Sequence, residues 1–344
     1  MVLNKTSLLL CLALMAALPA IGAPVPAQAA AEAKPAAPTV PEMVAAAFRF
    51  GDFPELERLY AIYGQPGLRS PLTGNPRIEH FWMGVSQISN SNLRVTEDYY
   101  TQIDAMTQKW ALDHPESVLA QLLYAESLTT HAWFHRGGGY ANTVSPASWA
   151  GFRKYLNLAN DQLRRSQKLA VKDSSWNQIM MTVGQGLNWN VNQFLAVLED
   201  GLAKNPDHDN LYFQMETMLL PKWGGDIETC ERFIESVTER TREKRGMEMY
   251  ARLYAGLSYA QLEQSLFSDT RASWPKMKAG FEDRLSRYPH VDHRNMYAYF
   301  ACMAKDRQAL QEQLQKIGDA FDPSFWGHNP ERTFEECKAM ARQL

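Results

Sequence analysis

Two histidines four residues apart are the residues in this sequence best spaced for metal chemistry. His131 and His135 belong to the stretch HAWFHRGGGY, and on a helix both imidazoles would project from one face. This is the spacing of the zinc ligands in HExxH enzymes, but Ala132 occupies the position of the catalytic glutamate. The spacing indicates no third ligand, so we predict that the protein binds no metal and needs no cofactor.

The same stretch is typical of a helix end. A helix that begins near Pro115 would end at three glycines, which most readily adopt the left-handed capping conformation. His135 and Arg136 would lie in the last turn, where positive charge meets the negative end of the helix dipole. Three glycines exceed what one cap needs, so we also expect the loop backbone to approach a neighbour or a ligand closely. Arg136 beside exposed amides is suited to a carboxylate or a phosphate.

A second turn, LLPKWGGD, combines a helix stop with a helix start. Pro221 would end the preceding helix, two glycines allow the chain to reverse, and Asp226 is placed to cap the next helix. Trp223 is large for a turn residue, and we expect it to pin the turn to its neighbour, with ligand stacking as the alternative. The predicted binding residues from both stretches and the adjoining loop are His131, Trp133, His135, Arg136, Tyr140, Trp149, Lys222 and Trp223.

Acidic residues offer a third chemistry, glycoside cleavage, which needs two carboxylates facing each other across a cleft. Asp207, Asp209 and Asp292 are the candidates, but each stands where a helix should begin, so helix capping is their predicted role. The first two are also too close in sequence to face each other. The cluster 290–294 is interpreted as a solvated helix start rather than as an anion or metal site. The sequence contains no G-x-S-x-G elbow, P-loop or dinucleotide fingerprint.

Helices are the elements that must position these residues. Strand patterns are nearly absent, whereas apolar residues recur every three to four positions in 116–134, 193–203, 249–266 and 295–317. Three quartets with matching residue types follow one another at a spacing of 35 residues, which indicates repeated helix hairpins. The quartets are Ala159, Leu163, Ser166 and Val171; Phe194, Leu198, Gly201 and Pro206; and Thr229, Phe233, Ser236 and Thr241.

A period of about 34 residues is typical of tetratricopeptide repeats, although the Trp-Leu-Gly-Tyr signature of that repeat is not retained. We predict an all-α fold of tetratricopeptide-like helix hairpins that form a right-handed α-solenoid. A single domain would span 42–344, with a glycine-rich insertion at about 136–151. Insertions in repeat proteins often carry binding features.

The N-terminus predicts export. Lys5 precedes an apolar run of about ten residues, too short to cross a bilayer, and small residues follow Pro19. We predict a signal peptide at 1–23, a flexible Ala/Pro-rich leader at 24–41, and a periplasmic or secreted protein without a membrane span. Lys and Arg (35) nearly balance Asp and Glu (38), so no basic field is available for nucleic acid.

Three cysteines would remain after cleavage of the signal peptide. An oxidising compartment permits a bridge between Cys302 and Cys337, but we expect these two and Cys230 to be lone thiols packed in helix faces.

Three segments of the chain resemble a bacterial family called domain of unknown function 4034. They are AWFHRGGGYA, FRKYLNLANDQL and LLPKWGGD, and the resemblance covers roughly residues 50 to 320. The run from Pro221 to Gly225 is its most specific element, and the pair Arg136 and Gly137 is the second. The resemblance implies a helical, repeat-like and often exported protein without an assigned activity, and it transfers no catalytic residue.

Stacked helix pairs form grooves that commonly bind peptides or protein segments. Nine tryptophans and fourteen tyrosines suit an aromatic-lined groove. We therefore predict an exported recognition or scaffold module for an unidentified protein or peptide partner, and a binding protein rather than an enzyme. The alternative is a helical-toroid enzyme acting on glycans or cell-envelope polymers.

Overall fold

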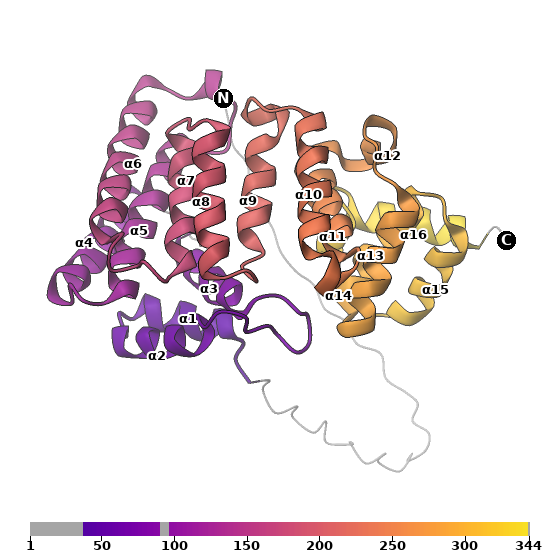
Figure 1. Cartoon of the computed structure of the whole chain (residues 1–344), viewed down its shortest axis with the longest axis horizontal. Helices are drawn as coiled ribbons and strands as arrows, with labels where there is room; N and C mark the ends of the chain where they lie inside the picture. The colour runs from indigo at the N-terminus through magenta and orange to yellow at the C-terminus, as the bar shows by residue number, and fades with distance from the viewer. Residues whose placement is uncertain (1–36, 90–95, 343–344) are drawn as a thin grey trace, which may run out of the picture. The chain divides into compact units, whose positions relative to one another are not determined.

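The computed structural model describes residues 37–89 and 96–342, and these residues form an all-α fold (Figure 1). Extended pairing within them is limited to one isolated bridge between Arg69 and Pro76. The α-helices are α1 (Val40–Arg49), α2 (Phe53–Tyr63), α3 (Arg77–Ser89), α4 (Glu97–Asp113), α5 (Val118–Arg136), α6 (Pro146–Ser166), α7 (Ser174–Gly186), α8 (Val191–Lys204), α9 (Asn210–Leu219), α10 (Ile227–Arg245), α11 (Glu248–Leu257), α12 (Leu266–Asp269), α13 (Trp274–Arg287), α14 (Val291–Met303), α15 (Arg307–Ile317) and α16 (Pro330–Ala341).

The helical domain begins slightly earlier than the sequence predicts. The predicted signal peptide and most of the leader lie outside the described residues, but Val40 and Pro41, assigned to the leader, begin α1, and Thr39 caps it. Thr39 and Glu42 form a capping box, in which each side chain accepts a hydrogen bond from the other residue's backbone N–H. This local signal fixes the helix start.

Successive helices pack as antiparallel hairpins, and alternate helices also contact one another. The hairpins are α6–α7, α8–α9, α10–α11, α13–α14 and α15–α16, and α5, α7, α9 and α11 form a row of neighbouring helices. Figure 1 shows α6, α7, α8 and α9 side by side. This pattern of neighbours is consistent with stacked helix hairpins, and the right-handed tetratricopeptide-like solenoid stays a prediction.

The predicted repeat register holds for the first two quartets and is wrong by one residue in the third. Leu163 and Leu198 are fully or almost fully buried, as expected. Phe233, however, is only half-buried, and Ile234 takes the equivalent buried position, 36 residues after Leu198. The interval from Leu198 to Ile234 is therefore one residue longer than the predicted 35, and it contains the 3-10 turn Pro221–Trp223 between α9 and α10.

The buried apolar residues form two clusters, one centred on α1–α7 and one on α8–α16, and Trp189 packs against both. Contrary to the expectation of lone thiols, Cys302 of α14 and Cys337 of α16 form a disulfide, while Cys230 is free and buried as expected. Within the described ranges, no helix is both long and apolar enough to cross a membrane.

Candidate functional site

The two turns that the sequence singled out meet at one cleft. Its volume is about 580 Å³, and it lies between the loop after α5, the start of α6, and the turn between α9 and α10. Six of the eight predicted binding residues line it, and we call it the tryptophan cleft. They are Trp133, Arg136, Tyr140, Trp149, Lys222 and Trp223.

Aromatic rings in edge-to-face contact form one wall of the tryptophan cleft. The ring centroids of Trp133 and Trp223 are 6.0 Å apart, and Phe152 lies 5.1 Å from Trp133 and 5.6 Å from Trp149. The indole N–H groups of Trp133 and Trp223 are buried and have no hydrogen-bond partner among the described residues. An unpaired buried donor costs about 1–3 kcal/mol.

Two cations line the cleft together with these rings. The guanidinium carbon of Arg136 is 5.9 Å from the centroid of the Trp223 ring, and Lys222 donates a hydrogen bond to the Ala260 carbonyl (2.9 Å). Within the part of the chain that the structure describes, neither cation forms an ion pair and no carboxylate lines the cleft. The cleft therefore carries positive charge that no neighbouring carboxylate neutralises.

The glycine-rich loop is shorter and more open than predicted. Helix α6 already begins at Pro146, so the loop spans 137–145 rather than 136–151. Helix α5 ends at Gly137, which confirms the helix-end interpretation, but with φ 65° and ψ −179° this glycine is not in the left-handed helical conformation; its N–H bonds to the Trp133 carbonyl. Arg136 donates to the Gly137 and Gly139 carbonyls, so the loop folds around the guanidinium. A Cβ on Gly137 or Gly138 would meet nothing, so the expected close approach to a protein neighbour is absent there.

The turn after α9 matches its prediction. Pro221 follows the end of α9, Gly224 has a φ of 89°, and the Asp226 carboxylate accepts a hydrogen bond from the Thr229 N–H at the start of α10. Trp223 is half-buried against Trp133, so it pins the turn as expected while one side lines the cleft.

The other two predicted residues, His131 and His135, do not line the tryptophan cleft. They contact α4 and α6 instead, together with Glu97, Asp104 and Tyr155. One carboxylate oxygen of Glu97 lies 3.1 Å from the Nε2 atoms of both histidines. Asp104 lies 2.6 Å from Nδ1 of His131.

The three ring systems of this cluster are stacked. The Tyr155 ring centroid lies 3.6 Å from that of His131 and 5.3 Å from that of His135, and the Tyr155 hydroxyl donates to Glu97 (3.3 Å). Burial and the charge of Glu97 raise the pKa of Tyr155 to about 12. Burial alone would raise the pKa of Glu97, but its contacts with His131 and His135 outweigh burial and lower that pKa.

Glu97 and Asp104 could not be paired with the histidines from the sequence because they stand about thirty residues before them. Their spacing of seven residues, two helical turns, was the available signal that both lie on one face of a helix. That signal does not say which helix face lies opposite, so it could not join them to His131.

The predicted helix-capping role of Asp209 and Asp207 is wrong. Asp209 is fully buried, makes no capping hydrogen bond, and accepts hydrogen bonds from Arg69 (3.0 Å), Arg245 (2.7 Å) and Arg252. Asp207 pairs with Arg69 and Arg245. Burial alone would raise the pKa of Asp209, but the three guanidinium groups outweigh it and hold the pKa well below its usual range.

The same charged network fastens the loop 64–76 to the later helices. Arg284 donates to Glu248 (2.5 Å), to Asn75 (2.6 Å) and to the Thr73 carbonyl (2.7 Å). His293 is also buried, with Nε2 2.9 Å from the Thr73 carbonyl oxygen. The cluster 290–294 is thus not a solvated helix start, and these charges have a structural role.

The helix start in that cluster is capped by His290 rather than by the predicted Asp292. The imidazole of His290 accepts a hydrogen bond from the backbone N–H of Asp292 (3.4 Å), and Asp292 itself lies in the first turn of α14. Of the acids predicted to cap helices, Asp226 does so, whereas Asp207, Asp209 and Asp292 do not.

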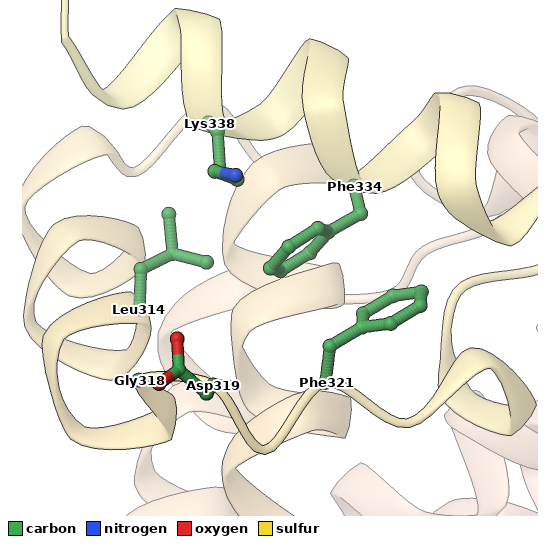
Figure 2. A pocket seen from close by; sticks show the side chains of 6 residues that line it. All are labelled: Leu314, Gly318, Asp319, Phe321, Phe334 and Lys338. Carbon is green, nitrogen blue, oxygen red and sulfur yellow. The ribbon is translucent and has the colours of Figure 1, made fainter. Parts of the chain in front are cut away.

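Another hollow, of about 280 Å³, lies between α15 and α16 near the C-terminus (Figure 2). Figure 2 shows Phe321 and Phe334 facing each other, with ring centroids 4.5 Å apart, and Lys338 next to Phe334. Lys338 is already paired with Glu335 (2.7 Å), and no predicted site residue lies there. The tryptophan cleft is larger, and its cations are not paired in this way.

Comparison with known proteins gives no match to a protein-family model, to a curated protein or to a solved structure.

Proposed function

We propose that the protein is a recognition module that binds an acidic peptide segment of a partner protein in the tryptophan cleft. The observation that carries this proposal is the pair of cations, Arg136 and Lys222, next to aromatic walls and without a carboxylate in the lining. A carboxylate of the ligand would lie near the cations, and an aromatic or aliphatic side chain would pack on Trp133 and Trp223.

The size of the cleft supports a short segment. A volume of about 580 Å³ falls within the range of about 300–1,000 Å³ typical of small-ligand sites, so it accommodates a few side chains. Tryptophan, tyrosine and arginine are also the residues most enriched where binding energy concentrates in protein interfaces. Tyr140, 83% exposed at the loop tip, is free to pack on such a segment.

Export remains part of this proposal. A disulfide such as Cys302–Cys337 persists mainly in oxidising compartments, which supports a periplasmic or secreted location. The resemblance to the bacterial family of unknown function stays a prediction and is consistent with export.

Glycan cleavage is the alternative function, and aromatic walls also suit sugar rings. It needs two carboxylates at the site, one with a raised pKa. The described lining of the cleft contains no carboxylate. Asp207 and Asp209 are neutralised by arginines, which lower the pKa values of both aspartates instead of raising them. These observations favour binding over cleavage.

A peptide array tests the proposal. Each acidic peptide is printed beside a copy with Gln and Asn in place of Glu and Asp, and the array is probed with the intact protein. We expect the bound peptides to combine carboxylates with aromatic or aliphatic residues. The double variant Arg136→Gln/Lys222→Gln should lose at least about tenfold in affinity, the effect of removing two charge-assisted contacts.

The matched control is Arg232→Gln, an exposed arginine of α10 paired with Glu228 outside the cleft, which should leave binding unchanged. Melting temperatures check that each variant is folded, since Arg136 also holds its own loop. Equal binding of acidic and neutral peptides, or full binding by the double variant, would contradict the proposal.

A further inference from the structure

We propose that Glu97, His131 and His135 form a binding site for one divalent transition-metal ion of the zinc class. The sequence lacked a third ligand for the two histidines, and the fold supplies it from α4. One ligand atom from each residue can be chosen so that all three lie within 4.8 Å of one another. Two imidazole nitrogens and a carboxylate are the ligand set of known catalytic zinc sites.

The distances fit a tetrahedral ion. Metal–ligand bonds of about 2.0–2.1 Å at tetrahedral angles place neighbouring ligand atoms roughly 3.3 Å apart. The observed separations from Oε2 of Glu97 to Nε2 of His131 and to Nε2 of His135 are both 3.1 Å. These two separations are within a few tenths of an ångström of the tetrahedral value, and the two histidine nitrogens lie within 4.8 Å of each other.

The Nε2 atoms of His131 and His135 point to a shared cation, because among the described residues only the Glu97 carboxylate lies beside both of them. Both are buried and make no hydrogen bond of acceptable geometry, although a carboxylate oxygen lies 3.1 Å away. When Nδ1–H of His131 donates to Asp104, Nε2 presents a lone pair to the Glu97 carboxylate. In that tautomer the lone pair and the carboxylate repel each other, and a metal ion bound between them would replace the repulsion with coordination.

Neighbouring residues orient the three proposed ligands, as residues around known metal sites commonly do. Asp104, His131 and the ion would form a carboxylate–histidine–metal series, in which the carboxylate fixes the tautomer and orientation of the ring. The Tyr155 hydroxyl holds the other oxygen of Glu97. A Cβ on Gly151 would come within 2.5 Å of the His135 ring, so the glycine leaves the space that this ring occupies.

The site is accessible from one side and separate from the tryptophan cleft. The side chain of Glu97 is 50% exposed, whereas His131 is fully buried, so an ion would enter past Glu97. None of the three proposed ligands lines the cleft. The metal proposal therefore stands independently of the proposed peptide binding.

Zinc titration of the untagged, EDTA-treated protein by calorimetry tests the site. We expect saturable binding of one zinc ion per chain, and Co²⁺ should give the intense visible absorption of a tetrahedral site. Asp104→Asn should weaken zinc binding about 10–100-fold, as the loss of an outer-shell partner does. Glu97→Gln and His135→Gln remove ligands and should weaken it by at least about 100-fold.

His114→Gln is the matched control, because His114 is an exposed histidine that also lies beside a glutamate, Glu116 (3.5 Å). It should bind zinc as the unmodified protein does. His131 is fully buried and its replacement risks misfolding, so the test rests on the half-exposed Glu97. Absence of zinc binding, or equal binding by Glu97→Gln and His114→Gln, would overturn the proposal.

Discussion

Replacing Asp209 by asparagine should destabilise the fold more than any exposed charge substitution. The Asp209 carboxylate is fully buried and accepts hydrogen bonds from Arg69, Arg245 and Arg252. Asparagine keeps the shape but removes the charge, which leaves three buried guanidinium groups undercompensated. Removing one partner of a buried ion pair costs about 3–5 kcal/mol. Because Asp207 still neutralises two of the arginines, we expect the lower end, about 3 kcal/mol.

Urea denaturation followed by circular dichroism measures this loss, with an unchanged dependence of the free energy on urea concentration. Asp113→Asn is the control, since Asp113 forms an exposed ion pair with Lys109 (2.6 Å) and such pairs contribute at most about 1 kcal/mol. A loss at Asp209 no larger than at Asp113 would refute the structural role assigned to the arginine network.

The pH dependence of the same variant gives a second readout. The pKa of Asp209 is lowered in the folded state, so its contribution to stability is present above the unfolded-state pKa of about 3.9 and is lost as pH falls further. The unmodified protein should therefore lose stability on acidification below pH about 4, and Asp209→Asn should lose less over the same interval.

Three further predictions concern other parts of the fold. Replacing both Cys302 and Cys337 by serine opens a 35-residue loop and should lower the free energy of unfolding by about 4 kcal/mol. The melting temperature should fall, as it should when dithiothreitol reduces the disulfide of the unmodified protein, and an unchanged melting temperature would contradict this. Burial raises the pKa of Glu216 well above its usual value, so the carboxyl stays protonated in the fold and stability falls as pH rises above about 4.5. In unfolding experiments between pH 5 and 8, the free energy of unfolding of Glu216→Gln should fall less steeply with pH than that of the unmodified protein. Identical slopes in both proteins would contradict this prediction. Gly225→Ala would place a Cβ 2.0 Å from the Leu219 carbonyl oxygen and should cost about 1–3 kcal/mol by urea denaturation, whereas a neutral effect would show that the turn relaxes freely.

Local signals in the sequence predict the turns correctly. The glycines after Arg136 end α5, and Pro221 and Asp226 end one helix and begin the next, because each residue acts on backbone groups within a few positions of itself. Six predicted binding residues consequently meet in one cleft, although the sequence does not say that the two turns are neighbours in space.

Contacts between residues far apart in the sequence could not be predicted from such local signals. Asp209 stands at a helix start and looks like a cap, but its partner Arg69 comes from 140 residues away. Glu97 meets His131 only because α4 packs on α5. Two cysteines 35 residues apart could equally be free or bridged until α14 and α16 are placed side by side. Which faces pack together depends on the whole set of helices, and no single segment encodes it.

The indole N–H signals in a ¹H–¹⁵N NMR spectrum test the central claim, peptide binding in the tryptophan cleft, most directly. Nine tryptophans give nine such signals, which single substitutions assign. On addition of an acidic peptide selected from the array, the signals of Trp133 and Trp223 should move because both rings line the cleft that the peptide would occupy. Trp326, fully buried and already bonded to Asn295 (2.9 Å), should not move. Binding that leaves Trp133 and Trp223 unshifted would place the ligand elsewhere and contradict the account.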